Sequence, residues 1–389
     1  MDIISKRTEN AKTYNIGGNK FRQEICIGAV HYKDDYSDKA EQFKDIDLTW
    51  VNNKITKAPY TLERIGNKII VLDKKTGQTG TIELTDIGAT TLSAASFDSV
   101  KTTEIVKDVD VEIIPAPDSI RFQTIIKDAT ALAELKYKVS GDIPIKYSAV
   151  DADGDSVPLI TSLTKGVLTE SVDAKSFTSL DEKKTAIKYP IKIDPTLTVQ
   201  GSGKDTWIDS ATQTTNYGDQ ESIRLYAGEG YSHGRYGLIE LPLTSLPSGA
   251  NVSSSTFSLY WYYTIDCAGD GCRLYRLRRG DWVEAEATWA IYKTSNNWGT
   301  AGAKNTTTDI DTSFDALTTF PEDFGWLSWD VKSFVEYAQT NSLNFNIRAN
   351  IATLDYPRFY SKEYETNTSL RPKLISEYTV AENKFFIIF

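Results

Sequence analysis

The region from Gly237 to Trp261 carries the clearest strand pattern in the chain. A first β-rich stretch is interrupted by the turn-forming residues Leu246-Pro247-Ser248-Gly249, and a second β-rich stretch follows. Side chains of a strand point alternately to opposite faces, so the second stretch separates into two groups. The two groups are Phe257, Leu259 and Trp261 on one face, and Ser258, Tyr260 and Tyr262 on the other. This pattern predicts a strand, a turn and a second strand.

Similar patterns recur in the first half of the chain. Asn67 to Leu84 predicts two strands joined by a Lys-Thr-Gly turn, and Ser119 to Ile126 and Ala133 to Gly141 predict two more strands. One short helix is predicted at Val331 to Gln339, where apolar residues recur at helical spacing and Asp330 is a candidate N-cap. The sequence therefore predicts an all-β protein with one short helix.

The length of 389 residues is sufficient for two hydrophobic cores. Asp194-Pro195 is the expected boundary, because proline cannot donate the hydrogen bond that a strand interior requires. We predict a β-rich scaffold or attachment domain at 1–195 and a jelly-roll-like antiparallel β-sandwich at 196–380. Residues 381–389 are predicted to form an apolar C-terminal docking tail.

Composition and charge narrow the classes of partner. The net charge is −10, from 43 basic and 53 acidic residues without a basic block, so we expect no nucleic-acid partner. No run of about 18 apolar residues occurs, so no membrane insertion is expected. The first residues, MDIISKRTENAKTYNIGG, lack the apolar core of a secretory signal.

Seven of the eight tryptophans lie between Trp207 and Trp329, among short motifs in a recognisable order. The motifs are DTWIDSATQTTNYG, a Leu-Tyr pair, GLIELPLTSLPSGANVSSSTFSLYW, DWVEAEATW, WDVKSFVEYAQTN, FYSKEY and RPKLISEY. Together they resemble a DNRLRE-type module, from an extracellular β-sandwich family related to disaggregatase and to some carbohydrate-binding modules. The resemblance covers Gly203 to Thr379. It implies a β-sandwich, a fold used both to bind glycans and to build surfaces.

A fainter resemblance covers the first half of the chain. The segments SKRTENAKTY, GAVHYKDD and FKDIDLTW are similar to parts of large bacterial wall-associated proteins, in which such a region precedes a DNRLRE-type module. YPIKIDPTL resembles the stretch that joins the two regions there. This resemblance implies a β-rich scaffold domain to which no activity is assigned.

Two groups of acidic residues are candidate calcium ligands. The string DADGDS, Asp151 to Ser156, begins like a calcium loop but lacks the glycine and the final glutamate of that motif, so we predict a hairpin turn. Asp205 and Asp209 flank Trp207 and point to one face, roughly 13 Å apart by strand rise. We interpret them as exposed strand ends; the alternative is that either one joins loop carbonyls around a structural calcium. No other cofactor is expected.

No constellation of residues indicates catalysis. Glu284 and Glu286 are neighbours along one segment, whereas glycoside hydrolysis requires two carboxyl groups facing each other across a bond. His233 lies in a glycine-rich loop without a partner motif and is interpreted as a surface residue. G-x-S-x-G, H-E-x-x-H and P-loop motifs are absent, so we expect no enzymatic activity.

The three cysteines fit structural roles. Cys26 lies in a strand-like run and is interpreted as a small buried hydrophobic residue. Cys267 and Cys272 frame CAGDGC, where a disulfide and a pair of thiols are equally compatible with the sequence. With only His31 and His233 as further ligands, zinc is not expected.

The stretch TWAIYKTSNNWG combines aromatic rings with amide and hydroxyl groups, which is what sugar recognition requires. Trp282 and Trp289 correspond to positions that pack between the sheets of the resembled family, so we assign them to the core. The candidate glycan-binding residues are Tyr292, Asn296, Asn297 and Trp298.

The chain closes with KFFIIF, an apolar run that requires cover on both faces of a strand. It either folds back onto its own N-terminal domain or docks into a neighbouring subunit, by adding a strand or by filling a groove. We predict docking by Phe385, Phe386, Ile387, Ile388 and Phe389.

An exterior-type module without an export signal suggests either a virus particle component, which reaches the outside on lysis, or a fragment of a larger exported protein. The leading prediction is a non-enzymatic structural protein on the surface of a virus particle, of a bacteriophage head or tail. Its partners would be other virion subunits or copies of itself, and also a cell-surface glycan if the sandwich binds one. The alternative is an extracellular or wall-associated bacterial carbohydrate-binding module or a component of a glycan-active enzyme.

Overall fold

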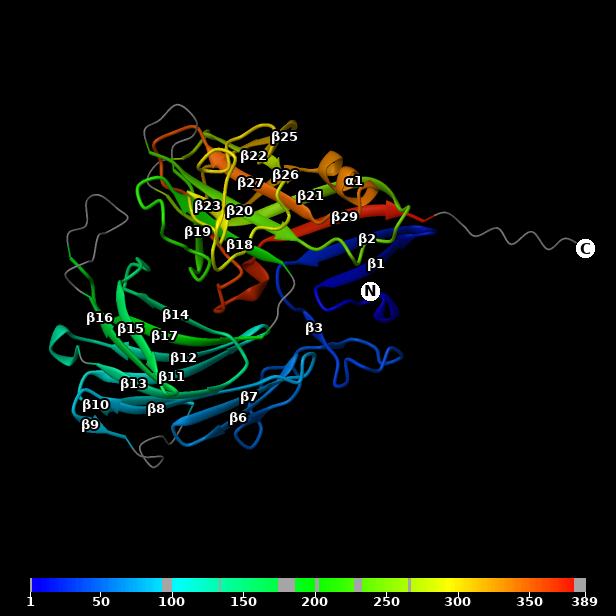
Figure 1. Ribbon diagram of the computed structural model, residues 1–389. Helices are drawn as coiled ribbons and strands as arrows, with labels where there is room; N and C mark the ends of the chain where they lie inside the picture. The colour runs from blue at the N-terminus through cyan, green and yellow to red at the C-terminus, as the bar shows by residue number, and fades with distance from the viewer. Residues whose placement is uncertain are drawn as a thin grey trace, which may run out of the picture. The chain divides into compact units, whose positions relative to one another are not determined.

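The computed structural model describes residues 2–92, 100–132, 134–173, 186–199, 203–226, 233–264 and 267–380. The chain divides into two compact units (Figure 1). Unit 1 contains Met1–Val30 and Ser202–Phe389, and unit 2 contains His31–Gly201. With 51% of the residues in strands, the predicted all-β class is confirmed.

Unit 2 is built from an eight-stranded sheet and a five-stranded sheet. The larger sheet contains β5 (Lys54–Ile55), β6 (Tyr60–Ile65), β7 (Lys68–Asp73), β8 (Thr79–Ile87), β9 (Thr90–Thr91), β13 (Leu135–Gly141), β15 (Leu159–Thr164) and β16 (Val167–Val172). The smaller sheet contains β10 (Lys101–Val106), β11 (Val109–Ala116), β12 (Ser119–Ile126), β14 (Ile145–Val150) and β17 (Ile191–Thr198). A short pair, β3 (His31–Tyr32) and β4 (Lys44–Asp45), completes the unit.

Alternating apolar residues of both sheets form one hydrophobic core in unit 2. Phe122 of β12 contacts Tyr137 of β13 edge-on at 6.0 Å between ring centroids, which joins the two sheets. The strands predicted at 67–84, 119–126 and 133–141 correspond to β7 with β8, β12 and β13.

Pro195 does not end a strand, contrary to the sequence prediction. It lies inside β17, which is paired with β12 on one side and β14 on the other. The pairing with β12 is interrupted between Ile193 and Thr196, so the missing N–H of Pro195 leaves no ladder bond unmade on that side.

Unit 1 is a second pair of antiparallel sheets. Its seven-stranded sheet contains β1 (Ala11–Gly17), β2 (Lys20–Cys26), β19 (Ser222–Arg224), β21 (Asn251–Tyr263), β26 (Gly325–Asp330), β28 (Arg358–Tyr360) and β29 (Lys373–Thr379). Its five-stranded sheet contains β18 (Lys204–Asp209), β20 (Arg235–Leu241), β22 (Gly271–Leu277), β25 (Ile310–Thr319) and β27 (Phe345–Ile351). The predicted strands within Gly237–Trp261 correspond to β20 and β21.

The first thirty residues correct the expected division of the chain at 195. β2 pairs along its whole length with β29, so the N-terminal hairpin extends a sheet of unit 1 (Figure 1). Phe21 of β2 stacks on Tyr378 of β29 at 5.7 Å between ring centroids, on the buried side of this sheet. Sequence separation concealed the pairing, because the two strands lie about 350 residues apart along the chain.

Helix α1 (Lys332–Thr340) confirms the predicted helix with its start shifted by one residue. Val331 occupies the N-cap position, while the Asp330 carboxylate accepts the Lys332 backbone N–H at 3.0 Å. Phe334, Val335 and Ala338 are buried against the sandwich. Within the described ranges, no helix is long and apolar enough to cross a membrane.

Candidate functional site

Two of the predicted glycan-binding residues belong to the core. Tyr292 and Trp298 are 7% and 4% exposed, and they pack with Trp282 and Trp289 in one hydrophobic cluster. The Trp298 indole N–H donates to the Thr288 carbonyl at 2.9 Å. The prediction was wrong for these two rings, since neither offers a face to a ligand. The core assignment of Trp282 and Trp289 is confirmed.

The loop that carries these residues forms a small hairpin, β23 (Ile291–Lys293) with β24 (Asn296–Asn297). Asn296 is half-buried and accepts from the Tyr292 hydroxyl at 3.4 Å, whereas Asn297 is exposed. The hairpin thus places Tyr292 and Trp298 in the hydrophobic cluster. The composition of this loop therefore serves to close a hydrophobic cluster.

Trp298→Ala tests this correction. We expect the free energy of unfolding to fall by about 3–5 kcal/mol, because the substitution empties a buried aromatic site. Thermal and denaturant unfolding of wild type and variant measure it. Asn297→Ala is the exposed control. A variant as stable as wild type would contradict the assignment of Trp298 to the core.

The structure places all three cysteines in structural surroundings. Cys267 and Cys272 are thiols and not a disulfide. Cys272 points into the core from β22, while Cys267 Sγ lies 2.6 Å from Thr264 Oγ1. Burial raises the pKa of the Cys26 thiol to about 12, which disfavours the reactive thiolate.

The predicted docking residues 385–389 lie outside the described part of the chain.

The predicted turn at Asp151 is confirmed. The Asp151 carboxylate accepts the backbone N–H groups of Asp153, Asp155 and Lys188, at 3.0–3.1 Å, and so organises a turn. Gly154 at φ +75° lies in the region that glycine adopts without strain.

Asp209 is buried and is not an exposed strand end, which corrects the prediction. Its two oxygens accept from His233 Nε2 at 2.7 Å and from Arg235 Nε at 2.8 Å. His233 is therefore a structural partner of Asp209 and only partly exposed.

Asp205 is buried too, within an acidic cluster formed by Asp205, Glu284 and Glu363, whose carboxylate oxygens lie within 4.8 Å of one another. The Lys362 ammonium contacts both oxygens of Glu284 at 2.7 and 2.6 Å, and the Lys362 backbone N–H donates to Asp205 at 2.9 Å. Burial, followed by Glu363 and Glu284, raises the pKa of Asp205 well above its ordinary value. A lysine side chain thus supplies the cation that such a cluster requires.

The arrangement of Glu284 and Glu286 agrees with structural roles. Glu284 is held by Lys362, and Glu286 accepts the Thr294 backbone N–H at 2.7 Å. Each carboxylate is thus engaged in holding a loop.

The outer face of the seven-stranded sheet carries a row of aromatic side chains that sequence reasoning did not select. Neighbouring residues of the same strands, such as Phe257, Leu327 and Phe359, are buried between the sheets, so alternation directs the row to the outside. We call it the aromatic row, and its members, all half-buried, are Trp326, Tyr260, Tyr262, Tyr360 and Tyr364.

Each ring of the aromatic row contacts the next one in space, and the row extends across three strands and one turn. Tyr260 meets Trp326 edge-on at 5.3 Å between ring centroids and lies 5.7 Å from Tyr360. Tyr360 is stacked between Tyr262 at 4.2 Å and Tyr364 at 3.6 Å. The contacts fix each ring, so few rotamers would be lost when a ligand binds.

Polar and cationic groups border the row. The Lys373 ammonium lies 3.8 Å from the Trp326 ring centroid, and the Arg358 guanidinium lies 4.4 Å from that of Tyr263. Burial raises the pKa of the Tyr262 and Tyr360 hydroxyls, so both remain protonated and can donate hydrogen bonds. The row thus joins apolar ring surface to a series of donors and acceptors.

The acidic cluster also supports the aromatic row. Lys362 lies between Tyr360 and Tyr364 in the chain, and its ammonium anchors this turn to Glu284 on a distant loop. The ion pair therefore fixes the segment that carries two of the five rings.

Residues 197–378 match the family model described as Carbohydrate-binding module family 96. The C-terminal half of the chain contains a carbohydrate-binding module. This module includes the entire aromatic row and the acidic cluster. It confirms the expected resemblance to carbohydrate-binding modules, while the DNRLRE type in particular stays a prediction.

Comparisons with curated proteins and with solved structures give no further information on the function of the chain. No curated protein matches the chain. Among solved structures, the N-terminal domain of the Streptococcus gordonii adhesin Sgo0707 is similar over 92% of this chain and 86% of that chain, with 9% identity and a TM-score of 0.18. A likeness at this level carries no argument about fold or function.

Proposed function

We propose that the module at 197–378 binds a polysaccharide along the aromatic row and that the chain has no catalytic activity. The observation that carries the proposal is the continuous contact of five half-buried rings on the outer face of a β-sheet within a carbohydrate-binding module. Sugar rings have apolar C–H faces that pack on aromatic carbon, and hydroxyl groups that exchange hydrogen bonds with tyrosine hydroxyls.

An elongated row favours an extended ligand. Successive rings spread over β21, β26, β28 and the turn after it, so several units of a chain would be contacted together. Each contact is weak by itself, and binding gains from their number. Polysaccharides of cell surfaces and walls provide such repeated units, so we propose an extracellular or wall-associated location.

The virus-particle hypothesis remains a hypothesis without an observation in its favour. The family match supports the alternative, a bacterial carbohydrate-binding module. Unit 2 and residues 1–30 would then act as scaffold and attachment elements.

Alanine substitution in the row tests the proposed function. We expect Trp326→Ala and Tyr364→Ala each to weaken binding to an array-selected glycan by about tenfold or more, because removing an anchoring ring costs about 1–3 kcal/mol. Affinity electrophoresis or calorimetry with the full chain measures it. Tyr14→Ala, in β1 of the same sheet, is the matched aromatic control.

Folding must be preserved for this test to discriminate. Both row residues are half-buried, and the variants are therefore compared by thermal unfolding before binding is measured. Undiminished binding in both folded variants would contradict the proposal that the aromatic row binds the polysaccharide.

A further inference from the structure

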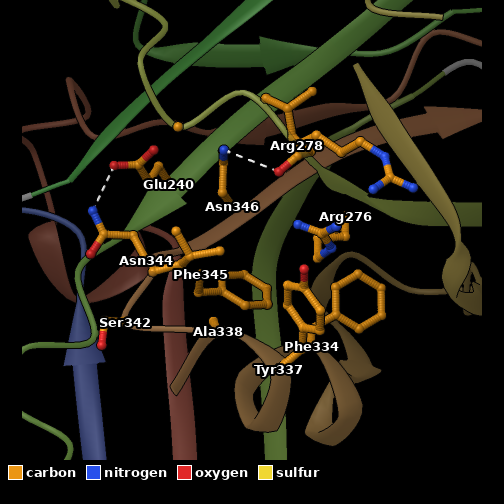
Figure 2. A pocket seen from close by; sticks show the side chains of 13 residues that line it. Glu240, Arg276, Arg278, Phe334, Tyr337, Ala338, Ser342, Asn344, Phe345 and Asn346 are labelled. Carbon is orange, nitrogen blue, oxygen red and sulfur yellow. Dashed lines mark hydrogen bonds between the residues drawn. The ribbon is translucent and has the colours of Figure 1, made fainter. Parts of the chain in front are cut away.

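A cavity of about 290 Å³ opens in unit 1 beside α1 (Figure 2). Phe334 and Tyr337 of α1 and Phe345 of β27 contribute aromatic walls. Glu240 of β20, Arg276 of β22 and Asn344 contribute polar groups. The aromatic row lies on the other sheet, so the two places are formed by different side chains.

The polar groups of the cavity are held in place. The Asn344 amide donates to Glu240 Oε1 at 2.8 Å, and the Lys204 ammonium lies 3.3 Å from Glu240 Oε2. The Arg276 guanidinium lies 4.2 Å from the Tyr337 ring centroid and donates to Asp311 at 2.7 Å. Each ionic group therefore already has a counter-charge.

One buried donor lacks an acceptor among the side chains that line the cavity. Arg276 is 7% exposed, and its Nε is a buried atom without a hydrogen-bond acceptor among the described residues. A buried donor without a partner costs free energy that a ligand oxygen would recover. Burial raises the pKa of Glu240, a sign that its carboxylate lacks full solvation and can gain from hydroxyl donors.

We propose that this cavity binds one uncharged sugar residue, as a second site that is separate from the aromatic row. Its volume is at the small end of the range for ligand pockets, which suits one ring rather than a chain. Tyr337 and Leu343 provide apolar surface for the C–H face of the ring, and Glu240, Asn344 and Arg276 provide acceptors and donors for its hydroxyl groups. Because the carboxylate and the guanidinium are already paired, a neutral polyol fits better than an ion. The choice of a sugar rests on the proposed function.

Two tryptophan indoles report separately on the two sites. The Trp282 indole N–H donates to Asn346 Oδ1 at 3.2 Å, and Asn346 lines the cavity. Figure 2 shows Asn346 between Glu240 and Arg276. The indole signal of Trp282 in a ¹⁵N spectrum should therefore respond to the cavity, and that of Trp326 to the row.

The test titrates the full chain with glucose, galactose, mannose and N-acetylglucosamine separately. At least one of them is expected to shift the Trp282 signal saturably. Glu240→Gln should weaken this response by about tenfold or more, because a hydrogen bond to a charged group is lost. Asn344→Ala, at an exposed position, is a second variant in case Glu240→Gln fails to fold. Glu336→Gln on the outer side of α1 is the control and should leave the response unchanged.

The outcomes separate the cavity from the row. A Trp282 signal that ignores all four sugars, or a response that both cavity variants leave intact, overturns the proposal. Trp326→Ala should leave the Trp282 response as in wild type. If polysaccharide binding depends on the aromatic row while the Trp282 signal does not shift with any sugar, only the cavity proposal fails. If Trp282 responds while the row variants bind polysaccharide normally, only the proposal that the aromatic row binds polysaccharide fails.

Discussion

Lys362→Met is expected to lower the free energy of unfolding of unit 1 by about 3–5 kcal/mol, because it removes one partner of a buried ion pair and leaves carboxylates without their cation. The Lys362 ammonium is buried and lies within hydrogen-bonding distance of both Glu284 oxygens. Although burial opposes its charge, the carboxylates of Glu284, Glu363 and Asp205 raise the pKa of Lys362. Thermal unfolding should show a midpoint lower by roughly 10 °C.

A control and a rescue sharpen this prediction. Lys332→Met removes a more exposed helix pair, 3.3 Å from Glu336, and should change stability by about 0.5 kcal/mol or less. Calcium should restore part of the lost stability in Lys362→Met, because the three carboxylates offer oxygen ligands that Ca²⁺ prefers, and should not affect wild type. Glycan binding should weaken as well, since the turn with Tyr360 and Tyr364 loses its anchor. A variant that melts like wild type would contradict the role of Lys362.

Raising the pH from 5 to 9 is expected to destabilise unit 2, and Glu170→Gln is expected to remove most of that dependence. Glu170 on β16 is fully buried, and neither of its carboxylate oxygens has a hydrogen-bond partner among the described residues. Burial, together with the charge of Asp194, raises its pKa from 4.5 to about 8.

The direction follows from proton binding. Between the ordinary pKa and about 8 the folded state holds a proton that the unfolded state has released, so stability decreases as pH rises through this window. The slope is up to about 1.4 kcal/mol per pH unit, and stability levels off above the folded pKa. Denaturant unfolding across the pH series, with hydrogen exchange of β12 and β16 peptides, measures it. Glu134→Gln is the exposed control. A flat profile in wild type would mean that Glu170 is not the titrating group.

Local patterns were sufficient to predict several of the longer strands and the helix. Turn residues and alternation located β7, β8, β12, β20 and β21, and helical spacing located α1. These elements depend on neighbours in the chain, which a single sequence contains. The pairing of β2 with β29 depends on residues at opposite ends of the chain, and no local pattern reports it.

The site was harder to predict because residue type does not determine exposure. Trp298 and Tyr292 lie among polar residues and still pack in a buried cluster, since the hairpin folds over them. The same alternation that placed Tyr260 and Tyr262 opposite Phe257 and Trp261 did contain the signal for the aromatic row. Recognising it required knowing that Trp326 and Tyr360 come from strands on either side of Tyr260.

Buried charges were missed for the same reason. Asp205 and Asp209 look like exposed strand ends in isolation, but the Lys362 backbone N–H and the Arg235 guanidinium donate to them from other segments. A carboxyl group can be buried when hydrogen-bond donors come from elsewhere in the fold, and a single sequence does not show which segments supply them.

The most direct test of the central claim follows the tryptophan indole N–H signals of the full chain during titration with an array-selected oligosaccharide. The Trp326 signal should shift in a saturable manner, because its ring belongs to the aromatic row, while the Trp298 signal should stay in place, because its indole is buried and bonded to Thr288. Saturable binding that shifts Trp298 and leaves Trp326 unchanged would contradict the account.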